Sequence, residues 1–142
     1  MLPCIAHEAI LWREQDSEHA AKVLASCRPP TLLCAWQLLE IRNAMRLKVF
    51  RREVSPEQYA EADGYLRTDV EAGILAAAPI DLDTTLARAA RLSEAWTMRL
   101  GCRTLDIIHV SAALLLKADQ LITFDRRQGD LAKKAGLKVH GV

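Results

Sequence analysis

The sequence alternates short apolar runs with longer segments whose apolar residues recur at helical spacing. The short runs predict strands at residues 31–35, 74–80, 120–124 and 137–142. The opening stretch "MLPCIA" can form one more strand, although Pro3 suits the start of a strand better than its middle. Strands that alternate with helices indicate a parallel sheet covered on both faces. We therefore expect the α/β class, as a three-layer α/β/α sandwich with a parallel central sheet.

Capping signals set the expected helix boundaries. Ser17 can cap a helix that runs to about residue 26, and "SPEQ" at residues 55–58 is a capping box with proline at the first helical position. Asp83 and Thr104 are further candidate N-caps. The expected helices span residues 17–26, 36–52, 56–73, 84–96, 105–118 and 126–136.

Length and composition restrict the class of protein. The chain has 142 residues and shows no repeat or linker, so we expect one domain over residues 1–142. Its formal net charge is +1, so any attraction to RNA must come from local patches. None of the four cysteines forms a CxxC pair, which disfavours a zinc site. The start does not resemble a signal peptide and no apolar run has the length of a membrane span, so we expect a cytoplasmic protein that does not enter a membrane.

Three carboxylates stand at the edges of apolar elements. Asp106 falls in the first turn of a predicted helix, where a negative charge gains about 0.3–1 kcal/mol from the helix dipole. Asp125 comes one residue after a predicted strand, where aspartate commonly forms a turn or caps a helix. Glu40 lies in "CAWQLLEI" and has no basic residue three or four positions away. A carboxylate in such surroundings is costly unless it is paired, protonated or bound to a metal ion.

These carboxylates can meet at one place in a parallel sheet. Ligands of such sheets bind beyond the carboxyl ends of the strands. Three acids gathered there repel one another unless a cation lies between them, and magnesium prefers oxygen ligands. A magnesium ion activates water and stabilises the charge of a phosphoryl transition state. Because the sequence has neither a Walker loop nor a GxSxG motif, metal-assisted hydrolysis of a phosphodiester is the reaction class that fits.

Two stretches carry a family resemblance. "LLEIRNAMRLKVFRREVSPEQ" and "LGCRTLDIIHVSAALLLKADQLITFDRRQGDLAKKAGLKV" resemble the PIN-domain family, and within it the VapC-type ribonuclease toxins. The likeness extends from about residue 17 to residue 139. It implies a parallel sheet between helices, an acidic site for Mg²⁺ with Mn²⁺ as an alternative, and hydrolysis of RNA. It also implies the role of toxin in a type II toxin–antitoxin pair, with a cognate antitoxin protein and a second copy of the chain as partners.

The resemblance assigns roles to particular residues. Glu40 matches the acid on the helix after the second strand, Asp106 the acid that opens a later helix, and Asp125 the acid after the next strand. By this likeness the three form the catalytic and metal-binding set. Asn43 and Thr123 match polar positions that often accompany the acids.

The sequence departs from the family pattern at its first strand. The family places an aspartate at the end of that strand, near residues 3–5 here, but "MLPCIAHEA" contains none. Glu8 is the nearest acid and His7 the nearest other metal-ligand type, and both fall a few residues late. Three explanations stay open: a start upstream of the present one, a degenerate site, or substitution by Glu8. The alternative function is therefore a catalytically degenerate PIN-like domain that binds RNA or a protein partner.

Other polar residues lie beside the candidate acids. Arg103, Arg126 and Arg127 flank the two aspartates and can hold RNA phosphates, although most surface arginines are merely solvated. His109 follows Asp106 by three positions and can assist the site, although a histidine in an apolar helix is more often a core or capping residue. A small-molecule phosphohydrolase has no substrate motif to support it.

Overall fold

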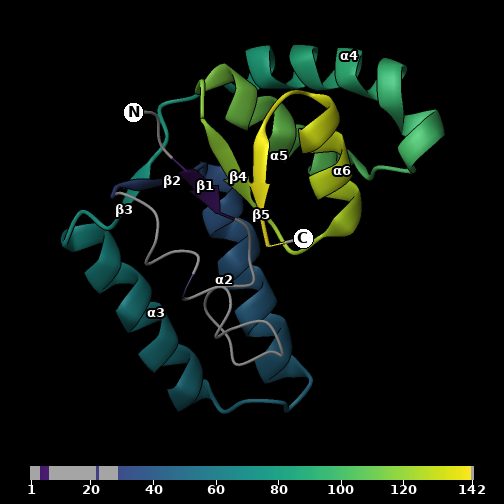
Figure 1. Ribbon diagram of the computed structural model, residues 1–142. Coiled ribbons are helices and arrows are strands. Elements are labelled where there is room, and N and C mark those ends of the chain that lie inside the picture. Colours follow the sequence, from purple (N-terminus) through teal and green to yellow (C-terminus); the bar gives the residue numbers. More distant parts are fainter. Residues whose placement is uncertain (1–3, 7–21, 23–28, 142) are drawn as a thin grey trace.

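Short parallel strands form a sheet at the centre of the protein (Figure 1). The computed structural model describes residues 4–6, 22 and 29–141. Within them the spatial order of the strands is β3-β2-β1-β4-β5, and each neighbouring pair is parallel. The α/β class with a parallel central sheet is thus confirmed, and "MLPCIA" does contain the central strand. The strands are β1 (Cys4–Ala6), β2 (Thr31–Leu33), β3 (Leu75–Ala77), β4 (Gln120–Ile122) and β5 (Lys138–His140).

The helices fall into two groups. One group contains α2 and α3, which lie side by side and extend away from the sheet (Figure 1). The other contains α4, α5 and α6, which contact one another. The helix expected at residues 17–26 lies outside the described residues. The described helices are α2 (Ala35–Phe50), α3 (Pro56–Glu71), α4 (Leu82–Leu100), α5 (Thr104–Leu115) and α6 (Arg126–Lys134).

Two apolar cores lie on opposite faces of the sheet. Leu33 of β2 packs in a cluster with residues of α2, α3 and β3, whereas its neighbour Leu32 packs against a larger cluster built from α4, α5, β4 and α6. Successive side chains of a strand point to opposite faces, so the two clusters lie on opposite sides of the sheet. The protein therefore has the expected three layers, with the sheet between two sets of helices.

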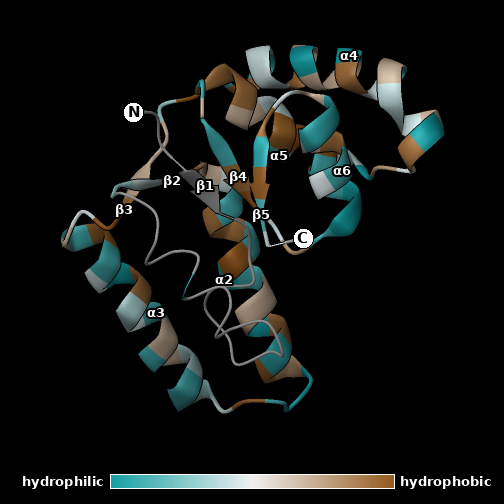
Figure 2. Ribbon diagram, viewed as in Figure 1, coloured by the Kyte–Doolittle hydropathy of each residue, from teal (hydrophilic) through white to brown (hydrophobic). Residues whose placement is uncertain are grey.

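The hydropathy of each helix agrees with how far that helix is buried in the fold. Figure 2 shows α5 as mostly hydrophobic and α6 as mostly hydrophilic. The helix α5 contacts α4, α6 and β4, and seven of its twelve residues are buried. Among the described residues, none of the helices combines the length and the hydropathy needed to cross a membrane.

The start of α2 differs from expectation. The strand expected over residues 31–35 ends at Leu33, because Cys34 is the N-cap of α2. Oε1 of Gln37 accepts a hydrogen bond from the backbone N–H of Cys34 at 2.7 Å, which fixes the helix start at Ala35, one residue earlier than expected. At the other end α2 stops at Phe50, and Arg52 adopts a positive φ of 60°.

The expected cap of α4 is wrong. The N-cap is Asp81 rather than Asp83, because the Asp81 carboxylate accepts hydrogen bonds from both the backbone N–H and the hydroxyl of Thr84, at 2.8 and 2.7 Å. The helix also continues past Trp96 to Leu100. It ends there because Gly101 takes a φ of 65°, the left-handed conformation that commonly terminates helices.

The capping box at the start of α3 is confirmed and supports a stability prediction. The hydroxyl of Ser55 accepts a hydrogen bond from the N–H of Gln58 at 3.2 Å, and Oε1 of Gln58 accepts one from the N–H of Ser55 at 2.8 Å. We expect Ser55→Ala to lower the free energy of unfolding by about 1 kcal/mol in urea titrations. Ser55→Asp, which keeps a capping oxygen, should unfold like the parent. An equal loss in both variants would show that the loss does not come from removal of the capping oxygen.

Candidate functional site

The order in which the chain adds strands to the sheet switches from one side of β1 to the other, between β1 and β4. The path from β1 to β2 and β3 moves toward one edge of the sheet, whereas β4 leads to β5 at the opposite edge. In parallel α/β sheets, ligands bind beyond the carboxyl ends of the strands at such a reversal. Asp125 follows the end of β4 by three residues, so it lies at the edge of the sheet where a site is expected.

Asp125 is held in place by hydrogen bonds on both sides. It is the N-cap of α6, and its Oδ1 accepts from the N–H groups of Arg127 at 2.8 Å and Gln128 at 3.1 Å. Its own N–H donates to the hydroxyl of the buried Thr123 at 3.1 Å. The capping role considered for Asp125 is therefore confirmed. No described residue bonds its second oxygen, Oδ2, which leaves that atom able to bind a ligand.

Asp106 is buried at the start of α5, with 6% of its surface exposed. Its Oδ2 accepts a hydrogen bond from the backbone N–H of Arg103 at 2.8 Å. The expected cap, Thr104, is therefore wrong: Arg103 is the N-cap and Thr104 is the first residue of α5. The carboxylate of Asp106 reaches back over one turn, and this bond moves the helix start one residue earlier. Oδ1 of Asp106 has no hydrogen bond to a described residue.

Glu40 finds its partner on another helix. Its Oε2 lies 2.8 Å from Nε2 of His109, although the pair lacks the alignment of a hydrogen bond. The His109 side chain is 1% exposed and that of Glu40 is 18% exposed. The nearby Arg42 points elsewhere and pairs with Asp63 at 2.8 Å. A carboxylate that lacks a local partner in the sequence is thus matched across the fold, from α2 to α5.

The buried thiol of Cys102 connects the starts of α5 and α6. Its Sγ is 3.8 Å from the carbonyl oxygen of Arg127, so the chain just before α5 contacts the first turn of α6. Burial raises the pKa of this thiol, and the negative charges of Asp106, Asp125 and Asp130 raise its pKa further. The contact between Cys102 and Arg127 brings together the two helix starts that carry Asp106 and Asp125. Asp130 also acts on the thiol, and no sequence pattern marked this residue.

The acids do not form a complete set of metal ligands among the described residues. In residues 4–6, 22 and 29–141, no three or more His, Cys, Asp or Glu side chains are grouped so that they could hold a metal ion. Asp106 and Asp125 each use one oxygen to cap a helix, and Glu40 contacts His109. The oxygen donors themselves suit magnesium. The joint role of Glu40, Asp106 and Asp125 as metal ligands stays a prediction, and His7 and Glu8 lie outside the described residues.

The three arginines selected from the sequence are exposed at the same end of the molecule. Arg103 caps α5, and Arg126 and Arg127 open α6. Within the described part of the chain, none of their side chains forms an ion pair. Exposed guanidinium groups that bracket Asp106 and Asp125 are well placed to hold a phosphate chain next to the acids.

Gln128 is a further polar residue that sequence reasoning missed. It is fully buried in the first turn of α6, and neither atom of its side-chain amide has a hydrogen-bond partner among the described residues. A single glutamine after two arginines looks like an exposed helix position, so the sequence carried no signal for its burial. Asn43, by contrast, is exposed on α2 and makes no described contact with the acids.

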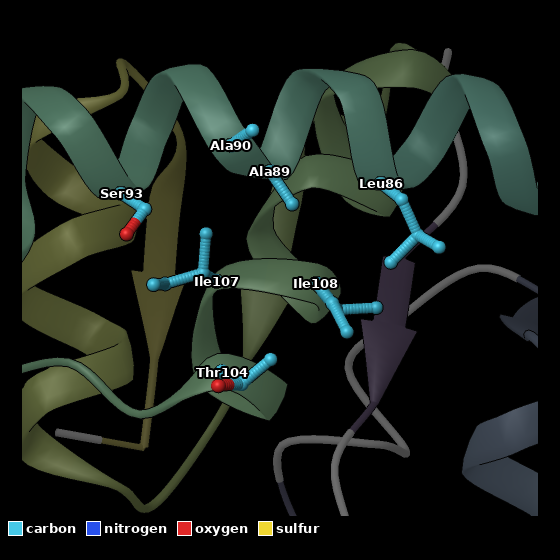
Figure 3. A pocket seen from close by; sticks show the side chains of 7 residues that line it. All are labelled: Leu86, Ala89, Ala90, Ser93, Thr104, Ile107 and Ile108. Atoms are coloured by element: carbon cyan, nitrogen blue, oxygen red, sulfur yellow. The ribbon is translucent and has the colours of Figure 1, made fainter.

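A separate apolar pocket lies between α4 and α5 (Figure 3). Its volume is about 250 Å³. None of the candidate acids or arginines lines it, so it plays no part in the site described above. The lining residues are Leu86, Ala89, Ala90, Ser93, Thr104, Ile107 and Ile108.

Comparison with known proteins supports the fold alone. No protein-family model matches the chain, and no curated protein is detectably similar to it. Among solved structures, the crystal structure of PAE2754 from Pyrobaculum aerophilum is similar with a TM-score of 0.62 and 18% sequence identity. The match covers 97% of this chain and 83% of that protein. The similarity confirms that the whole α/β architecture occurs in a solved protein.

Proposed function

We propose that the chain is a PIN-like, metal-dependent endoribonuclease that hydrolyses RNA phosphodiesters and acts as the toxin of a type II toxin–antitoxin pair. One observation carries the proposal. Cys102, just before α5, contacts the carbonyl oxygen of Arg127 in the first turn of α6, so the helix starts that carry Asp106 and Asp125 lie together, and Glu40 contacts α5 one turn after Asp106. Acids from three separate elements thus approach one edge, as a site for phosphodiester hydrolysis requires.

The three acids would serve as metal ligands. Asp106 and Asp125 each keep one oxygen without a described hydrogen bond, and with Glu40 they would hold Mg²⁺, or Mn²⁺ as an alternative. Such an ion supplies Lewis-acid polarisation of the phosphodiester. The backbone bonds to Asp106 and Asp125 fix these side chains before RNA arrives, so little reorganisation is needed on binding.

Binding of RNA rests on a local patch rather than on overall charge. The net charge of +1 gives no long-range attraction, whereas Arg103, Arg126 and Arg127 are exposed around the acids. Contacts to phosphate position the RNA without reading its sequence. We therefore expect weak RNA binding that decreases steeply with salt concentration.

A non-catalytic PIN-like domain is the second candidate, and two observations favour it. β1 carries no aspartate, and the described residues contain no group of three metal ligands. Incubation of labelled RNA with the full chain, in Mg²⁺, in Mn²⁺ and in EDTA, separates the two functions. Cleavage that EDTA abolishes supports the nuclease, whereas binding without cleavage in either metal supports the second candidate. A small gene beside this one, whose product binds the chain, would support the toxin role.

We expect this chain to bind magnesium weakly, in the millimolar rather than the micromolar range. Each missing carboxylate removes a charge that opposes a divalent ion, and magnesium gives up its waters reluctantly. Calorimetric titration of the full chain measures this affinity, with Asp125→Asn as the control that should weaken it further. A micromolar dissociation constant would contradict the expectation and would point to Glu8 as an additional ligand.

A further inference from the structure

The contact between Glu40 and His109 joins two elements that are far apart in the sequence. Nε2 of His109 lies 2.8 Å from Oε2 of Glu40, and the histidine side chain is almost fully buried. His109 sits in α5, the most apolar of the described helices, between the buried residues Ile107 and Ser111. Its ring therefore has little freedom to move, whereas glutamate has a long side chain with many rotamers.

His109 lies close to Asp106 on α5, so its contact with Glu40 bears on the candidate site. Asp106 and His109 are three residues apart, so their side chains lie on the same side of the helix, one turn from each other. A ring fixed at this point holds the Glu40 carboxylate beside the turn that carries Asp106. Without the ring, the partly buried carboxylate has no basic residue three or four positions away on its own helix, and the nearby Arg42 pairs with Asp63.

We infer that His109 is a positioning residue, which holds the carboxylate of Glu40 in the orientation that the candidate site needs. The inference rests on the proposed function and adds to it a residue that touches neither metal nor RNA. Groups that orient a metal-binding carboxylate commonly affect metal affinity or activity by about 10–100-fold when they are removed. A histidine that merely fills the core would change stability and leave the metal requirement unaltered.

Two substitutions separate the polar contact from the bulk of the side chain. His109→Leu fills a similar volume but cannot contact Glu40 through a polar atom, whereas His109→Gln places an amide near the position of Nε2. We expect His109→Leu to need about 10–100-fold more Mg²⁺ for half-maximal RNA cleavage. His109→Gln should recover most of that loss. An equal metal requirement in the parent and in His109→Leu would overturn the inference.

Ser111 offers a matched control on the same helix. It is fully buried, and its hydroxyl donates to the carbonyl oxygen of Thr85 on α4 at 2.8 Å. Ser111→Ala therefore removes a buried polar contact of α5 that does not involve Glu40. We expect it to lower the melting temperature without changing the metal requirement. If Ser111→Ala raises the metal requirement as much as His109→Leu does, the effect comes from general damage to α5 and the inference fails.

A measurement without RNA or metal keeps the inference separate from the proposed function. Long-range ¹H–¹⁵N spectra report the ring nitrogens of each histidine in the full chain. In Glu40→Gln we expect the Nε2 signal of His109 to shift, while that of His140, exposed on β5, stays in place. An unshifted His109 signal overturns the inference even if the parent cleaves RNA. A shifted signal in a chain that neither binds metal nor cleaves RNA would overturn the nuclease proposal and leave only the contact.

Discussion

Asp106→Asn is expected to reduce metal-dependent RNA cleavage about a thousandfold while the fold is retained. Loss of a metal-binding charge acts on the transition state and costs several kcal/mol, and about 4 kcal/mol corresponds to that factor in rate. Asparagine keeps the size of the side chain and a carbonyl oxygen. It can therefore still accept the 2.8 Å hydrogen bond from the N–H of Arg103 that starts α5. Single-turnover cleavage at saturating metal measures the effect.

The fold of the Asp106→Asn variant should be at least as stable as that of the parent without metal. The negative charges of Asp106, Asp125 and Asp130 act on the same buried thiol, that of Cys102, so removal of one of these charges relieves repulsion. Asp83→Asn is the matched control, because Asp83 is an exposed acid in the first turn of α4, away from these acids. Cleavage at the parent rate would remove Asp106 from the mechanism. Loss of activity through unfolding alone would leave Asp106 the role of a helix-start residue.

The architecture was predictable because its signals are local. Strands and helices differ in the period of their apolar residues, and the alternation of the two periods implies a parallel sheet. The capping box at Ser55 and Gln58 also needs only four consecutive residues, and it forms as expected. The stretch "MLPCIA" was expected only as one more possible strand, and the structure places that strand, β1, at the centre of the sheet.

Helix starts were less predictable because neighbouring residues compete to cap them. Asp81 and Asp83 are both good capping residues, and the choice depends on which one meets the N–H of Thr84. At α5 the N-cap is Arg103 rather than the expected Thr104, although arginine is not a usual capping residue. The start is set instead from within the helix, by the carboxylate of Asp106. Such choices depend on three-dimensional geometry that a residue pattern does not contain.

The candidate site was predictable in its acids and not in their surroundings. Asp125 and Asp106 stood out because each marks the edge of an apolar element. The partner of Glu40 could not be predicted, because His109 is distant in the sequence. Only the packing of α5 brings Nε2 of His109 within 2.8 Å of Oε2 of Glu40. The effect of Asp130 on the Cys102 thiol depends in the same way on the contact between Cys102 and the first turn of α6.

The second large effect concerns stability rather than chemistry. Leu121 is fully buried in β4, where it pairs in register with Ile5 of β1 and Val139 of β5. We expect Leu121→Ala to lower the free energy of unfolding by about 2–5 kcal/mol, since it removes buried apolar atoms and leaves a cavity. For a chain of this size the melting temperature should fall by about 5–20 °C. Leu39→Ala is the control, because Leu39 is 64% exposed on α2, and it should stay within about 0.5 kcal/mol of the parent.

The same variant tests whether the strand core and the site are separable. Asp125 is fixed by bonds to Thr123, Arg127 and Gln128 rather than by the side chain of Leu121. Well below its melting temperature, Leu121→Ala should therefore cleave RNA with the parent's metal requirement, in contrast to His109→Leu. A raised metal requirement at a temperature where the variant is fully folded would show that packing in β4, and not only the cap of α6, sets the position of Asp125.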